Sequence, residues 1–181
     1  MKNYVVASAL AASMVITPMA HAKSDSLTRT GDITQIAVPV GAGIISLMKD
    51  DTEGFFQLAE GALYTAAATH TLKAVVDAPR PDGSSNNSFP SGHTSAAAQG
   101  AAYLQFRYGW EYGVPAYALT ALVGYSRVQA KRHYWRDVAA GAAIATGIQY
   151  AVTELGYSAT GTYVMPYFNG DAVGVTANVK F

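Results

Sequence analysis

The stretch NNSFPSGHTSA, residues 86–96, places Pro90, Ser91, Gly92 and His93 directly before an alanine-rich segment. Ser91 stands where a helix N-cap is expected, because its side chain can accept a hydrogen bond from an amide of the first turn. Gly92 lets another group approach the backbone closely, and the unpaired amides of a helix N-terminus suit a phosphate. Two interpretations are open from this stretch alone: a helix start beside a surface histidine, or a site for an anion.

Apolar residues at helical spacing occur on both sides of this stretch. They predict helices near residues 32–49, 53–76, 92–107, 113–129 and 134–155. The segment DAPRPDGSSNNS, residues 77–88, has the composition of a loop. After Gly156, two β-prone runs flank Asn169-Gly170-Asp171, which indicates a hairpin. We therefore expect an all-α bundle of about five to six helices with a short C-terminal β-hairpin tail.

The first 22 residues have the features of a secretory signal peptide. Lys2 precedes an apolar run, and Ala20-His21-Ala22 matches the small-x-small cleavage pattern. The expected organisation is a signal peptide (1–22), a helical domain (23–156) and the hairpin tail (157–181). This organisation predicts an exported, periplasmic protein with possible membrane association.

The apolar runs Ile33–Met48, Tyr112–Ser126 and Val138–Thr153 are candidates for membrane spans. A helix of about 16 residues is roughly 24 Å long, whereas the hydrocarbon core of a bilayer is about 30 Å thick. Polar residues such as Gln35, Thr120 and Gln149 also interrupt the runs. The pattern favours helices of a buried core, and leaves open that they lie on or dip into a membrane.

Charge and cysteine content exclude several classes of protein. The chain has 12 basic and 12 acidic residues, so no field of one sign attracts nucleic acid, and no protein partner is implied. It has no cysteine, which excludes disulfides, thiolate metal sites and thiol nucleophiles.

Two further clusters contain groups suited to phosphate chemistry. Lys73 and Arg80 place two cations on either side of a predicted helix end. Downstream, SRVQAKRHYWRD (126–137) contains Arg127, His133 and Asp137. If the last two lie on one helix face, the carboxylate accepts a hydrogen bond from one ring nitrogen and leaves the other as nucleophile or base. The alternative for this pair is a surface ion pair of little consequence.

Together the three clusters resemble the three-part signature of the type 2 phosphatidic acid phosphatase and vanadium haloperoxidase superfamily. The matching residues are Lys73-x6-Arg80-Pro81, Pro90-Ser91-Gly92-His93 and Ser126-Arg127-x5-His133-x3-Asp137, and the resemblance covers about residues 55–155. It implies a helical bundle in which these motifs meet at one phosphate. As implied by the resemblance, His133 attacks phosphorus, Asp137 orients it and His93 protonates the leaving group. Phosphate oxygens are bound by Lys73, Arg80, Arg127, Ser91 and the Gly92 amide.

This signature predicts a phosphatase that needs no metal or cofactor, because fixed cations and amides can stabilise the charge on a phosphoryl group. The expected substrate is a phosphomonoester or diphosphate of a lipid, cleaved through a phosphohistidine outside the cytoplasm. The alternatives are a soluble periplasmic acid phosphatase, a vanadium-dependent haloperoxidase-like oxidoreductase and a non-catalytic envelope protein. Lys131, Arg132 and Arg136 beside His133 either receive a polyanionic head group or form a solvated loop.

Overall fold

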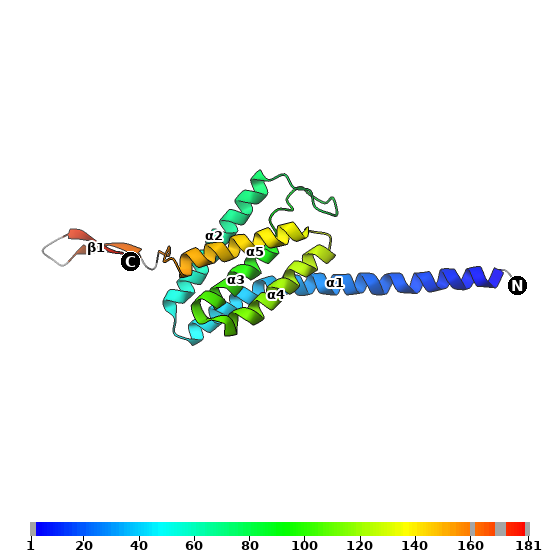
Figure 1. Cartoon of the computed structure of the whole chain (residues 1–181), viewed down its shortest axis with the longest axis horizontal. Coiled ribbons are helices and arrows are strands. Elements are labelled where there is room, and N and C mark those ends of the chain that lie inside the picture. Colours follow the sequence, from blue (N-terminus) through cyan, green and yellow to red (C-terminus); the bar gives the residue numbers. More distant parts are fainter. Residues whose placement is uncertain (1–2, 160–161, 169–172, 180–181) are drawn as a thin grey trace.

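The structure is a computed structural model that describes the backbone of residues 3–159, 162–168 and 173–179 and the side chains of residues 25–159. Within these residues the helices are α1 (Asn3–Met48), α2 (Thr52–Val75), α3 (Gly92–Tyr108), α4 (Trp110–Gln129) and α5 (Trp135–Thr153), followed by strands β1 (Thr162–Phe168) and β2 (Val173–Val179). The five helices form a bundle, and the first part of α1 projects from one end of it (Figure 1). The all-α bundle predicted from the sequence is confirmed.

The two strands pair antiparallel, from Thr162 opposite Val179 to Phe168 opposite Val173. The predicted turn at 169–171 lies outside the described residues.

One predicted helix boundary is wrong. The helix expected to begin at residue 32 begins at Asn3, and it runs without a break through the segment interpreted as a signal peptide. Residues 23–31 carry no apolar stripe, because this part of α1 lies beside the polar end of the bundle, where Thr28 and Asp32 contact Arg127. Cleavage after residue 22 remains a prediction.

Helix α3 is the centre of the bundle, since it packs against α1, α2, α4 and α5. Ala97, Ala98, Ala101 and Ala102 are completely buried in it. Side chains as small as alanine allow other helices to approach from several directions, which explains why an alanine-rich segment with no single apolar face forms the central helix.

Four helix ends meet at one end of the bundle. Ser91 is the N-cap of α3, as the sequence predicts, and α5 begins at Trp135 with Asp137 in its first turn. Lys73 and Arg127 lie in the last turns of α2 and α4, respectively. Because α2 and α4 end where α3 and α5 begin, the three sequence motifs come together at this end.

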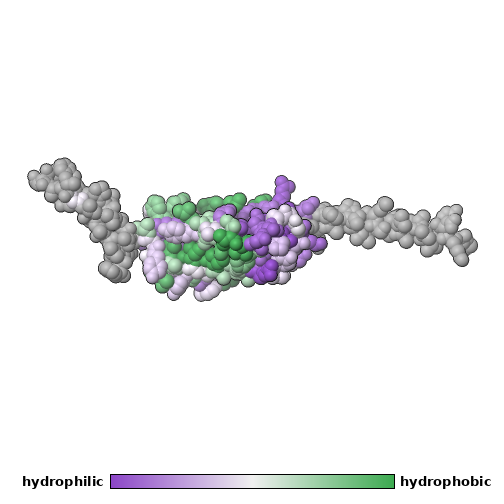
Figure 2. Space-filling view, turned by 90° about the horizontal axis from the view of Figure 1, so that it is seen from above, coloured by the Kyte–Doolittle hydropathy of each residue, from purple (hydrophilic) through white to green (hydrophobic). Residues whose placement is uncertain are grey.

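The surface divides into a polar end and an apolar body. Hydrophilic residues gather at the end of the bundle from which α1 projects, and apolar residues cover much of the remainder in the view of Figure 2. On α1, a stripe of large apolar side chains is more than half exposed, namely Ile33, Ile36, Val40, Ile44 and Leu47. Among the residues searched, Asp25–Met48 is the helical segment long and apolar enough to cross a membrane.

Candidate active site

A cavity of about 990 Å³ opens at the polar end of the bundle. Six of the eight predicted site residues line it: Lys73, Arg80, Gly92, His93, Arg127 and His133. The other two, Ser91 and Asp137, are completely buried and do not belong to the cavity lining. The structure therefore brings all three motifs to one place, with six residues at the cavity wall and two behind it.

His133 lies in the turn before α5, and its hydrogen bonding distinguishes its two ring nitrogens. Nδ1 lies 2.7 Å from the backbone oxygen of Ser88, a carbonyl that can only accept. Nδ1 is therefore the protonated nitrogen, which leaves Nε2 with a free lone pair. Because the His133 side chain also lines the cavity, the arrangement provides a nucleophile at the cavity wall.

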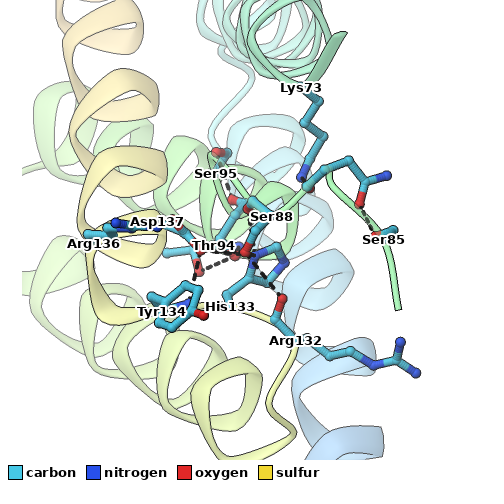
Figure 3. A network of polar contacts seen from close by, with 12 residues as sticks. Lys73, Ser85, Ser88, Thr94, Ser95, Arg132, His133, Tyr134, Arg136 and Asp137 are labelled. Carbon is cyan, nitrogen blue, oxygen red and sulfur yellow. Dashed lines mark hydrogen bonds and ion pairs between the residues drawn. The ribbon is translucent and has the colours of Figure 1, made fainter. Parts of the chain in front are cut away.

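Asp137 does not act on His133 in the way that the spacing predicts. The distance from His133 Nδ1 to Asp137 Oδ2 is 3.8 Å, too long for a hydrogen bond. Since α5 starts at Trp135, His133 precedes the helix, and Oδ2 of Asp137 instead accepts hydrogen bonds from Ser88 Oγ (2.6 Å) and the Tyr134 amide (2.9 Å). Asp137 thus holds the Ser88 segment whose carbonyl orients His133, and adds a buried negative charge nearby (Figure 3).

The surroundings keep His133 neutral at physiological pH. Burial, assisted by the positive charges of Lys73 and Arg80, lowers the pKa of His133 to about 4. A neutral imidazole is the form that can attack phosphorus, so the cations that suit a phosphate also keep the nucleophile unprotonated.

The second histidine, His93, contacts a residue that sequence reasoning missed. Its Nε2 lies 3.0 Å from Oδ1 of Asp32 on α1, and the same oxygen accepts a hydrogen bond from Arg127 Nη1 at 2.7 Å. Burial and the charge of Arg127 lower the pKa of His93, while Asp32 opposes this shift. Arg127 also donates from Nη2 to the Thr28 carbonyl (2.6 Å), so α1 contributes directly to the site.

Lys73 and Arg80 add positive charge at the cavity wall. Lys73 donates from Nζ to the backbone oxygen of Asn87 (2.7 Å), and burial together with the nearby Arg80 charge lowers its pKa. The Nε atom of Arg80 is buried and has no hydrogen-bond partner among the described residues. A buried guanidinium nitrogen without an acceptor is costly, and the residue to which it belongs lines the cavity, where its charge suits an anion.

In the motif at the start of α3, Ser91 has a structural role and Gly92 lines the cavity. The Oγ atom of Ser91 lies 2.9 Å from Thr94 Oγ1, accepts a hydrogen bond from the Thr94 amide as the helix cap and lies behind the cavity wall, so the contact of Ser91 with phosphate stays a prediction. Gly92 lines the cavity at the first position of the helix, where backbone amides have no intrahelical acceptor.

Several residues at the site could not be identified from the motifs. Asp32 and Thr28 belong to a segment without an apolar pattern, and Ser88 acts through its carbonyl, which carries no side-chain signal. For Ser88, the only signal in the sequence was its place in the polar run 84–88, just before the motif Pro90–His93. Arg132, for which two interpretations were open, lines the cavity and lies 3.5 Å from Asp82.

Comparison with known proteins agrees with this geometry. The model of the PAP2 superfamily matches residues 76–160. A lipid A 4'-phosphatase of Helicobacter pylori is 33% identical over 139 residues, which are 71% of this chain and 70% of that protein. A lipid A 1-phosphatase of Porphyromonas gingivalis is 44% identical over 82 residues, which are 43% of this chain and 17% of that protein.

Two solved structures have the same fold at 22% sequence identity. LpxE of Aquifex aeolicus has a TM-score of 0.62 over 74% of this chain and 86% of its own. A transmembrane PAP2-type phosphatidylglycerolphosphate phosphatase from Bacillus subtilis has a TM-score of 0.60 over 86% of this chain and 87% of its own.

The fold, the cavity with its histidines and cations, and these relatives define the class of protein, a phosphoric monoester hydrolase. The chain belongs to the PAP2 superfamily, which confirms the resemblance seen in its three motifs.

Proposed function

We propose that this chain hydrolyses the phosphate monoester of a lipid through a phosphohistidine formed on Nε2 of His133, on the extracytoplasmic side of a membrane. The observation that carries the proposal is the hydrogen bond from His133 Nδ1 to the Ser88 carbonyl, which fixes the tautomer and leaves Nε2 as the nucleophile in the cavity.

In the first step, the lone pair of His133 Nε2 attacks phosphorus and the bond from phosphorus to the ester oxygen breaks. The departing oxygen takes a proton from His93, because an alkoxide is a poor leaving group without one. Lys73, Arg80 and Arg127 stabilise the negative charge of the equatorial phosphoryl oxygens, and the free amides at the start of α3 add donors.

In the second step, His93, now neutral, removes a proton from water as the water oxygen attacks the phosphohistidine. The phosphorus–nitrogen bond breaks, its electron pair returns to Nε2, and inorganic phosphate leaves. His93 is protonated again at the end, so the cycle restores both histidines.

The surface and the relatives support a lipid as the substrate. The exposed apolar stripe of α1 suits contact with acyl chains, whereas a soluble acid phosphatase would gain nothing from it. Both curated relatives are named for phosphates of lipid A, which makes lipid A the first substrate to test. The predicted signal peptide would place the polar end outside the cytoplasm.

The experiment is phosphate release by the purified full chain in detergent micelles, with His133→Ala as the background. Substrates would be bisphosphorylated lipid A, phosphatidate, phosphatidylglycerol phosphate and a soluble sugar phosphate. We expect at least one lipid phosphate to be hydrolysed about tenfold faster than the sugar phosphate, or more. His133→Ala should release no phosphate from any of the substrates. Equal rates on soluble and lipid substrates would contradict lipid specificity, and full activity of His133→Ala would contradict the mechanism.

A further inference from the structure

Asp32 connects the first helix with two groups of the active site, the proposed acid His93 and the phosphate-binding Arg127. One oxygen of its carboxylate, Oδ1, lies 3.0 Å from His93 Nε2 and 2.7 Å from Arg127 Nη1. The two partners come from α3 and α4, so a single carboxylate of α1 joins three helices at the cavity wall. Asp32 itself lines the cavity and is about half exposed.

The packing of α1 holds this carboxylate in place. A Cβ atom at Gly31 would overlap Ser126 Oγ and lie 2.9 Å from Arg127 Nη2, so only glycine allows α1 to approach α4 this closely. The Thr28 carbonyl, one turn earlier, accepts a hydrogen bond from Arg127 Nη2. These two backbone features, both in the helical turn that precedes Asp32, thus fix its position relative to Arg127.

Arg127 keeps donors for substrate despite these contacts. Its guanidinium has five N–H groups, and its hydrogen bonds to the described residues use three, to Ser126 Oγ, Asp32 and Thr28. One N–H on each terminal nitrogen remains for phosphate oxygens. Asp32 therefore orients Arg127 without removing it from anion binding.

We propose that Asp32 is the positioning residue of the general acid: it holds the Nε2 side of His93, so that the proton passes to the leaving group from Nδ1. This inference rests on the proposed function, which makes His93 the acid. In the same way, the Ser88 carbonyl holds Nδ1 of His133 and exposes Nε2. Different acceptors thus hold opposite ring nitrogens of the two histidines, Nε2 of His93 and Nδ1 of His133.

The charge of Asp32 has a second consequence for His93. The charged groups that line the cavity with His93 are Arg127 from α4, Arg80 from the loop before α3, Lys73 from α2, Asp32 from α1 and Arg132 from the turn before α5, together with the titratable rings of His70 and His133. Most of these are positive and disfavour an imidazolium, whereas the Asp32 carboxylate favours it and raises the pKa of His93. Asp32 thereby extends to higher pH the range in which His93 holds the proton it must donate.

The test compares Asp32→Asn with wild type, using one lipid phosphate with an alkyl leaving group and p-nitrophenyl phosphate. Asparagine keeps the acceptor oxygen and removes the charge. We expect kcat for the alkyl substrate to fall about 10- to 100-fold, less than complete loss of an acid would cost, and the basic limb of kcat/KM to move to lower pH. The aryl substrate, whose leaving group needs little protonation, should lose less than about threefold in kcat/KM, which reports formation of the phosphohistidine and not its hydrolysis with His93 as base. KM should not rise, because a negative charge next to the phosphate site is removed.

Two further variants separate positioning from folding. Asp32→Glu should recover part of the alkyl activity, and Asp25→Asn, an exposed α1 carboxylate two turns away, should resemble wild type. Equal losses on both substrates with a raised KM and no movement of the basic limb would show that Asp32 is structural only and overturn the inference. If instead wild type is inactive on the lipid, or His133→Ala is active, the proposed function itself fails.

Discussion

At the scale of single residues, the proposed mechanism depends on the protonation state of His133. Burial and the charges of Lys73 and Arg80 lower its pKa to about 4, against about 6.5 for an exposed histidine. The native ring should therefore stay neutral as the pH falls from 7 to about 5, while the unfolded chain takes up a proton, so acidification through this window should also destabilise the fold. Histidine-selective NMR in detergent, with the signal assigned through His133→Gln, checks this. A His133 ring that titrates near 6.5 would contradict the description of the site.

The signature residues could be predicted because their types and spacings are specific, but the partners that orient them could not. The i, i+4 spacing of His133 and Asp137 suggested a direct hydrogen bond, whereas His133 lies before the helix and bonds to a backbone carbonyl. Asp32 is 61 residues from His93 in the chain. Only the packing of α1 against α3 reveals their contact, and no spacing within a motif encodes it.

At the scale of helices, Gly141 brings α5 against the start of α3. A Cβ atom there would lie 2.6 Å from the Ser91 carbonyl oxygen and 2.9 Å from Ser95 Oγ, whereas one at Gly147 would meet nothing within 4 Å. Gly141→Ala should therefore cost about 1–3 kcal/mol of stability and reduce activity by displacing the Ser91 segment from Asp137. Gly147→Ala, in the same helix, should be neutral or stabilising by up to about 1 kcal/mol, because alanine favours helix. Thermal unfolding and phosphate release measure both. Equal effects at the two glycines would show that this contact does not matter.

The start of α3 has a capping residue in the sequence and was predicted correctly. The start of α1 has no such signal and was not. Ser91 as N-cap places the start of α3 at Gly92, as expected from the sequence. The start of α1 was predicted at residue 32 because an apolar stripe begins there, yet the helix continues into a polar segment whose contacts are with the active site. The periodicity of apolar residues indicates a helix with a buried apolar face. It does not indicate a helix that packs through polar groups.

At the scale of the whole molecule, the polar end with the cavity and the apolar body predict a protein held at a membrane with its active site at the lipid–water boundary (Figure 2). The expressed protein should stay with membranes after washing with alkaline carbonate. Val40 is 53% exposed in the α1 stripe, so Val40→Asp should leave the bundle packed but weaken membrane retention, at a cost of about 2.5–3.5 kcal/mol if the residue reaches the bilayer centre. Release of the unaltered protein by the carbonate wash would contradict this orientation.

The proposed mechanism requires that the phosphoryl group is transferred to Nε2 of His133. The most direct test mixes the enzyme rapidly with ³²P-labelled p-nitrophenyl phosphate, quenches with alkali and maps the labelled residue by mass spectrometry. Because Nδ1 is held by the Ser88 carbonyl, we predict an acid-labile, alkali-stable phosphohistidine at His133 with phosphorus on Nε2, and more of it in His93→Ala, where hydrolysis is slowed. Label on Nδ1, on another residue, or persisting in His133→Ala would contradict the account.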